Sequence, residues 1–144
     1  MFKLKDLKMQ DERVFLITGA NSGLGYETSK FLLEKGATVI MCSRDIIKGE
    51  KAKQELLKFN FSGKIETVEL DLSDLNKVRQ FAEFIKNKFN SLDVLINNAG
   101  IMAPPKTFSS QGYEIQFAVN HLAHMCLTLE LLSMLEKRIN SRVV

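Results

Sequence analysis

Short apolar runs alternate along this chain with longer segments in which apolar residues recur at helical spacing. The runs are typical of buried strands, and they read RVFLITG (13–19), ATVIMCS (37–43), KIETVELDL (64–72) and LDVLINNAG (92–100). Helices are predicted from about 23 to 35, over 45–59 and over 73–89. The third has the clearest period, carried by Val78, Phe81, Ala82, Ile85 and Phe89.

The boundaries of these helices carry recognisable signals. Gly36 is expected to end the first helix, Asp45 to cap the second, and Ser73 or Asp74 to cap the third. After a loop with two prolines, a long helix is predicted from about 110 to 138. The final residues, RVV (142–144), are typical of the start of a fifth strand.

Strands that alternate with helices predict βαβ units, and therefore a parallel sheet. We expect one α/β domain over residues 1–144, a Rossmann-type doubly wound parallel sheet with helices on both faces, truncated at the start of strand five. The helix over 110–138 is apolar on most sides, so part of it and the strand-four edge should be left bare. The isolated chain should therefore self-associate, as a homo-oligomer or an aggregate.

Composition excludes several classes of protein. The net charge of +3 is spread along the chain without a basic run, which argues against nucleic-acid binding. No apolar stretch is expected to reach the ~18 residues of a membrane span, and the start MFKLKDLKMQ lacks the apolar core of a signal peptide. Cys42 and Cys126 are far apart, which suggests reduced thiols. A cytoplasmic location is expected.

The first strand ends in a glycine-rich turn, TGANSGLG (18–25), where the first helix is predicted to begin. A dinucleotide pyrophosphate needs free backbone N–H groups and the positive end of a helix. Gly19 would make the turn, and Gly23 and Gly25 would allow close approach and packing, while Asn21 and Ser22 could bond to phosphate. The alternative is a plain β-to-α turn without a ligand.

Four motifs in order are similar to those of the short-chain dehydrogenase/reductase family: TGANSGLG, DL (71–72), NNAG (97–100) and NHLAH (120–124). The resemblance covers essentially the whole chain. The stretch GYEIQFAVNHLAHMCLTLELL (112–132) most resembles the branch with retinol dehydrogenases and the WW-domain oxidoreductase, and it is also similar to protochlorophyllide reductases. Ala123 stands where that branch usually has glycine.

The resemblance implies roles in binding a nicotinamide dinucleotide. Asp71 would accept from the adenine amino group with Leu72 beside it, and Asn97 would tie neighbouring strands together. The remaining residues implied to contact the cofactor are Leu24, within the glycine-rich turn, and Asn98, Ala99 and Gly100, near the ribose.

The end of the second predicted strand bears on the choice of cofactor. An acid there would bind the ribose of NAD, but this chain has Ser43, followed by Arg44. A guanidinium can pair with the 2′-phosphate of NADP, and Lys48 could add a second charge. We therefore expect NADP(H) to be preferred over NAD(H). Alternatively, Arg44 is a solvated loop residue, Lys48 belongs to a charged helix face, and Asp45 is only a cap.

Hydride transfer is the cofactor's chemistry, and the family implies Asn, Ser, Tyr and Lys as the protein's contribution. Asn120 matches the Asn, while the Ser and the Tyr-x-x-x-Lys pair would follow Val144. Tyr26 and Lys30 have that spacing, but they should lie about 10 Å from a nicotinamide. His121 and His124 lack further ligands nearby, so no metal site is expected.

Two functions remain open at this point. The first is an NADP(H)-dependent oxidoreductase acting on a small alcohol or carbonyl, like a retinol dehydrogenase, of which this chain lacks the Ser, Tyr and Lys. The second is a catalytically inactive, stand-alone module that binds NADP or a protein partner. A methyltransferase on a similar sheet is disfavoured by NNAG and NHLAH.

Overall fold

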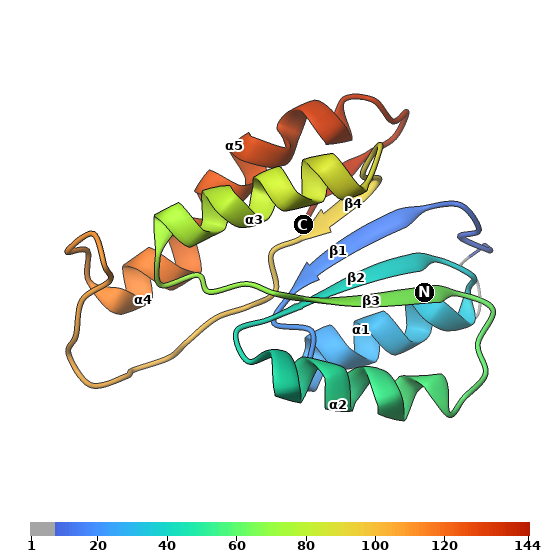
Figure 1. The fold of residues 1–144 in the computed structure, drawn as a ribbon, viewed down its shortest axis with the longest axis horizontal. Helices are drawn as coiled ribbons and strands as arrows, with labels where there is room; N and C mark the ends of the chain where they lie inside the picture. Colours follow the sequence, from blue (N-terminus) through green and yellow to red (C-terminus); the bar gives the residue numbers. More distant parts are fainter. Residues whose placement is uncertain (1–7) are drawn as a thin grey trace, which may run out of the picture.

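The computed structural model describes residues 8–144 and shows one parallel sheet with helices on both faces (Figure 1). The strand order is β3-β2-β1-β4-β5 and every paired strand is parallel. The first half comprises β1 (Val14–Thr18), α1 (Gly23–Glu34), β2 (Thr38–Ser43), α2 (Ile46–Leu57), β3 (Lys64–Glu69) and α3 (Leu75–Lys88). The second half comprises β4 (Val94–Ile96), α4 (Ile115–Phe117), the π-helical turn η2 (Ala118–Leu122), α5 (Ala123–Leu135) and β5 (Arg142–Val143).

Successive residues of each strand face opposite sides of the sheet, and this alternation divides the core in two. Leu16 and Ile40 lie in the cluster formed with α3 and α5. Their neighbours Ile17 and Met41 lie in the other cluster, against α1 and α2. Because both faces are covered, the strands are nearly continuous apolar runs, and the predicted doubly wound α/β fold is confirmed.

Helix caps follow the sequence signals closely. The Asp45 carboxylate accepts from the Lys48 backbone N–H at 3.1 Å, and Gly36 follows α1 with φ +85°. Of the two residues considered for α3, Asp74 is the cap, since it accepts from the Asn76 N–H at 2.9 Å. The expectation that the start MFKLKDLKMQ (1–10) lacks a signal peptide concerns a segment that lies mostly outside the described residues, and the cytoplasmic location stays a prediction.

The long helix predicted from about 110 to 138 is wrong at its start. Residues 108–114 form a turn closed by an isolated bridge between Phe108 and Glu114. The helical segment begins at Ile115, because the Glu114 carboxylate accepts from the backbone N–H groups of Gln116 and Phe117. It continues without a break through η2 and α5 to Leu135. Capping therefore shortens the helix that periodicity suggested.

The expectation of a bare strand-four edge is also wrong. β5 pairs with β4, with Val94 opposite Arg142 and Leu95 opposite Val143. The Asn97 N–H also donates to the Val144 carbonyl at 2.8 Å. Two residues of pairing are therefore enough to satisfy most of the outer edge of the short strand β4.

The outer side of the last helix is apolar and exposed, as expected. Leu127 and Leu131 are fully buried beneath it, whereas Met125 and Leu129 are 52% and 58% exposed. The segment Ile115–Leu135 has the length and mean hydropathy, 1.2, of a helix that could cross a membrane, unlike the sequence expectation. This segment packs against α3 and contributes Leu127, Leu131 and Met134 to the core on that face of the sheet.

Candidate functional site

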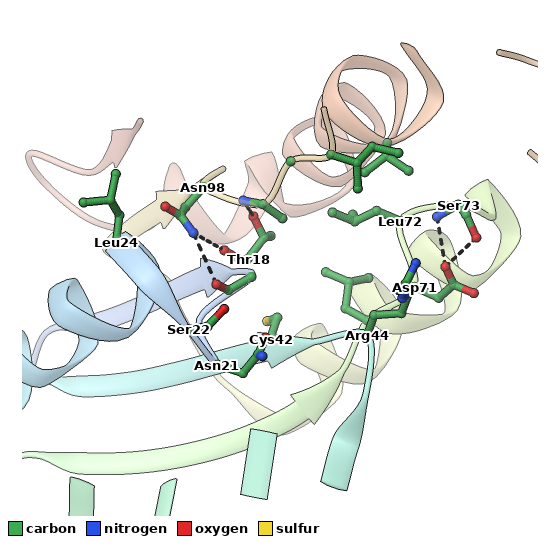
Figure 2. A pocket seen from close by; sticks show the side chains of 16 residues that line it. Thr18, Asn21, Ser22, Leu24, Cys42, Arg44, Asp71, Leu72, Ser73 and Asn98 are labelled. Carbon is green, nitrogen blue, oxygen red and sulfur yellow. Dashed lines mark hydrogen bonds between the residues drawn. The ribbon is translucent and has the colours of Figure 1, made fainter. Parts of the chain in front are cut away.

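A pocket of about 420 Å³ opens at the carboxyl ends of the central strands (Figure 2). Open parallel sheets bind ligands at this end, where the strand order reverses beside β1. Its volume is in the range of pockets for small organic ligands. The pocket is lined by Thr18, Gly19, Asn21, Ser22, Leu24, Cys42, Arg44, Leu70, Asp71, Leu72, Ser73, Asn98, Ala99, Gly100, Ile101 and Val119.

The turn after β1 requires glycine at two positions for different reasons. Gly19 has φ +64°, and a Cβ built there would lie 2.9 Å from the Ala99 Cα. A Cβ on Gly25 would lie 2.6 Å from both the Asn98 amide nitrogen and the Gly19 carbonyl oxygen. The backbones of the two loops therefore touch, and any side chain at either position would force them apart.

The helix α1 presents its N-terminus to this pocket. Its cap residue Ser22 makes no side-chain hydrogen bond to the helix, so the first backbone N–H groups of α1 remain free to donate to a ligand. Leu24 is 80% exposed and lines the opening. Free N–H groups and the positive end of the helix dipole suit an anion such as a pyrophosphate. Because a Cβ on Gly23 would meet nothing within 4 Å, this side of the turn is also open.

Thr18 and Asn98 fasten the two loops together beneath the pocket. The Asn98 amide donates to the carbonyl oxygens of Thr18 at 2.9 Å and Gly19 at 3.3 Å (Figure 2). The Thr18 hydroxyl in turn accepts from the Ala99 backbone N–H at 2.9 Å. The NNAG motif predicted that Asn98 lies near the ligand. Its side-chain amide nitrogen holds the glycine-rich turn in place.

The end of β2 carries the residues that would select the cofactor. Ser43 is buried, and its hydroxyl donates within the loop, to the Asn21 side chain at 3.1 Å or the Asp45 carbonyl at 2.8 Å. Arg44 is exposed, lines the pocket and forms no ion pair with any of residues 8–144. Lys48 does not line the pocket, and its ammonium lies 3.8 Å from the Asp45 carboxylate. The structure therefore brings Arg44 to the site and leaves Lys48 beside it.

Asp71, after β3, lies at the same edge of the pocket and is already bonded. Its carboxylate accepts from the Ser73 N–H and hydroxyl at 3.0 and 2.6 Å, and from Lys77 at 3.0 Å. Burial alone would raise the pKa of this carboxyl, but the hydrogen bonds from Ser73 and Lys77 outweigh it and hold the pKa below the usual value. Asp71 is therefore ionised at neutral pH and can accept further hydrogen bonds beside Leu72.

Asn120 lies in η2, one turn of wider helix between α4 and α5. Its side chain binds the backbone of Ile101 twice: the oxygen accepts from the N–H at 2.9 Å, and the amide donates to the carbonyl at 2.8 Å. A π-helical turn is often found at a functional site. Here it places Asn120 against the loop that ends at the pocket, close to Gly100.

Tyr26 and Lys30 do not form a catalytic pair in this structure. Neither lines the pocket, and the Lys30 ammonium lies over the Phe59 ring at 4.3 Å. Burial, together with Glu55 and Glu27, raises the pKa of the Tyr26 phenol, which is the opposite of what a general acid/base near neutral pH requires.

The expected absence of a metal site remains a prediction, although no group of three or more candidate ligands occurs within residues 8–144. His121 is exposed and stacks on Phe117, with ring centroids 5.2 Å apart. His124 is buried.

The structure thus brings together most of the predicted site residues around one pocket. Gly23, Gly25, Lys48 and Asn120 are not among those that line it, although Gly25 and Asn120 hold residues that do. Sequence reasoning gave no role in ligand binding to Thr18, Ser73 and Ile101, which line the pocket at or beside the motifs. Of these three residues, only Thr18 could have been found from the sequence, because it is the first residue of the glycine-rich motif.

Comparison with known proteins gives consistent matches. A family model described as short chain dehydrogenase matches residues 13–144. Retinol dehydrogenase 12 of Mus musculus is 42% identical over 132 residues, which cover 92% of this chain and 42% of that protein. Retinol dehydrogenase 14 of Mus musculus is 44% identical over 142 residues, again 92% of this chain and 42% of that protein. The chain therefore spans less than half the length of these relatives.

Solved structures of other proteins are also similar to this chain. A structure of an uncharacterized protein from Mycobacterium Paratuberculosis has a TM-score of 0.80 and 46% identity, over 92% of this chain and 46% of that one. The RhlG/NADP active-site complex of Pseudomonas aeruginosa has a TM-score of 0.76 and 27% identity, over 90% of this chain and 50% of that one.

Proposed function

The chain belongs to the short chain dehydrogenase family, and we propose that it carries the dinucleotide-binding part of an NADP(H)-dependent oxidoreductase that acts on an alcohol or carbonyl. The single observation that carries this proposal is the pocket where the glycine-rich turn, Arg44 and Asp71 meet. Similarity to retinol dehydrogenases supports a retinoid-like alcohol or aldehyde as the substrate class.

The residues around the pocket fit a dinucleotide. A Cβ on Gly23 would meet nothing within 4 Å, so this side of the turn is open to a phosphate, and the N-terminus of α1 offers free N–H donors. Asp71 would accept from the adenine at the far end of the same pocket. When bound, the nicotinamide would supply hydride transfer.

Preference for NADP(H) follows from charge at the end of β2. With the neutral Ser43 in the place of an acid, nothing at that position repels a 2′-phosphate. The Arg44 guanidinium, which forms no ion pair within residues 8–144, can pair with this group through two hydrogen bonds. The relative from Pseudomonas aeruginosa was solved with NADP, which supports the same choice.

The protein's own part in the chemistry would include Asn120, which fixes the loop that ends beside the pocket. This chain has no Tyr-x-x-x-Lys pair apart from Tyr26 and Lys30. We therefore expect the 144-residue chain to bind the cofactor without turning over a substrate. A chain that binds the cofactor without turnover also matches the alternative function, a catalytically inactive module that binds NADP or a protein partner.

Titration of NADPH and NADH by fluorescence tests the cofactor assignment. Arg44→Ala should weaken NADPH binding by about ten- to 150-fold, the value of a lost hydrogen bond to a charged group, and leave NADH unchanged. Lys51→Ala removes an exposed charge from α2 and serves as the matched control. Lys48→Ala should have a smaller effect than Arg44→Ala, because Asp45 already holds Lys48. Equal affinity of the unmodified chain for the two cofactors would refute the preference.

A further inference from the structure

His124 is a buried titratable residue to which the proposed function gives no task. It lies on α5 with 6% of its surface exposed, and it is not among the residues that line the pocket. Its two ring nitrogens reach different elements. Nε2 lies 3.0 Å from the Thr18 hydroxyl at the end of β1, and Nδ1 lies 3.2 Å from the Asn120 carbonyl oxygen in η2.

The partners of the ring decide where its proton lies. A carbonyl oxygen only accepts, so Nδ1 carries the proton and donates to Asn120. Burial lowers the pKa of His124, against the opposite effect of that hydrogen bond, so the ring is neutral at pH 7. Nε2 is then an acceptor, and the Thr18 hydroxyl donates to it. The other acceptor near this hydroxyl, the Ile96 carbonyl, is at 3.5 Å, the limit of a hydrogen bond.

Both partners of His124 hold the loop from Ala99 to Ile101, which forms one wall of the pocket. The Thr18 oxygen accepts from the Ala99 N–H at 2.9 Å, and the Asn120 side chain binds both backbone groups of Ile101. His124 therefore connects the anchors at the two ends of this loop. Through Thr18, His124 is also linked to Ala99, whose backbone approaches Gly19 closely.

We propose that His124 is a positioning residue of the dinucleotide site, which orients the Thr18 hydroxyl and thereby holds the Ala99 backbone in place against Gly19. Its ring fixes the direction of the Thr18 proton, so that the oxygen lone pairs stay available to the Ala99 N–H. Without the ring, this hydroxyl is free to rotate and the loop loses one of its two anchors. The inference rests on the proposed function only in that the ligand of the pocket is a dinucleotide.

Four variants separate hydrogen bonding from packing. His124→Phe keeps an aromatic ring and removes both hydrogen bonds. His124→Gln places an amide near the position of Nε2, and His124→Asn places one near Nδ1. Thr18→Val removes the hydroxyl at constant volume. His121→Phe is the matched control, because it makes the same change at an exposed histidine of the same motif.

NADPH affinity is the first measurement, with folding checked by circular dichroism. His124→Phe, His124→Asn and Thr18→Val should each weaken binding by about five- to tenfold, as expected for one lost neutral hydrogen bond. His124→Gln and His121→Phe should stay within about twofold. The double variant of Thr18→Val with His124→Phe should lose no more than either alone, because both break one chain of hydrogen bonds.

Amide hydrogen exchange at Ala99, followed by NMR, is the second measurement and needs no ligand. Exchange should quicken in Thr18→Val, His124→Phe and His124→Asn, and stay slow in His124→Gln. The proposal is overturned if His124→Gln is as impaired as His124→Phe, if His124→Asn restores binding, or if the double variant is additive. Should His124→Phe fail to fold, the Gln and Asn variants and Thr18→Val still decide. Absence of NADPH binding in the unmodified chain would refute the proposed function, while the exchange data would still test His124.

Discussion

Replacing Gly25 by alanine tests whether the contact between the two pocket loops is essential. The new Cβ would lie 2.6 Å from the Asn98 amide nitrogen and 2.6 Å from the Gly19 carbonyl oxygen. Both distances are well inside van der Waals contact, and the carbonyl is backbone that cannot swing away. The Asn98 side chain would have to move, which breaks its bonds to the Thr18 and Gly19 carbonyls.

The magnitude follows from these losses. Overpacking a tight site costs about 1–3 kcal/mol, and each lost hydrogen bond of Asn98 costs about 0.5–1.5 kcal/mol. Alanine returns at most about 1 kcal/mol through its helix propensity, and less in the first turn of α1. We expect Gly25→Ala to lower the free energy of unfolding by about 2–4 kcal/mol and to weaken NADPH binding at least tenfold.

Urea unfolding followed by circular dichroism measures the first quantity, and NADPH titration of the folded variant measures the second. Gly63→Ala is the matched control. Its Cβ would lie 2.5 Å from the Ala37 carbonyl oxygen and 2.7 Å from the Leu33 carbonyl oxygen, which are backbone atoms at the opposite end of the strands from the pocket. That variant should lose stability without losing affinity. If Gly25→Ala binds NADPH as tightly as the unmodified chain, the close approach of the loops is not what the site requires.

Two further predictions concern stability. Asp93 is buried and accepts from Arg138 and from the Val14 N–H, both at 2.9 Å, so Asp93→Asn should lower the free energy of unfolding by about 1.5–3 kcal/mol in urea. An effect no larger than that of Glu50→Gln, which breaks a partly exposed pair with Lys53, would contradict this reasoning. The pKa of His124 is lowered in the fold, so the unfolded chain binds a proton first as the pH falls below about 6.5, and stability should drop between pH 7.5 and 5.5. His124→Gln should flatten that dependence, and an unchanged drop in this variant would assign it to another group.

Much of the fold could be predicted because the relevant signals are local. The strands around Leu16 and Ile40 are buried on both faces, so they are apolar throughout and stand out in the sequence. The caps at Asp45 and Asp74 depend on residues two or three positions away. The start of the last helix was misjudged, because the segment SQGYE (110–114) was included in the helix, whereas the Glu114 carboxylate caps the helix that begins at Ile115.

In the candidate site, too, some features could be predicted from the local sequence and others depend on the fold. The glycine-rich turn and NNAG predicted the place of the candidate dinucleotide site, since close backbone approach limits these positions to glycine and small residues. The ion pair of Lys48 with Asp45 depends on side-chain directions that spacing does not reveal. The same holds for Asp71, which the sequence presents as a free acceptor and the fold supplies with Ser73 and Lys77.

The sequence by itself determined the order of strands and helices, the glycine-rich turn and the family, because each is recorded in neighbouring residues. Only the tertiary structure decided which distant groups share hydrogen bonds. Thr18 and His124 are separated by 106 positions and meet because α5 packs on the face of the sheet to which Leu16 and Thr18 point. A buried donor needs an acceptor within about 3 Å, and that acceptor is supplied by the packing of the whole domain and not by the local chain.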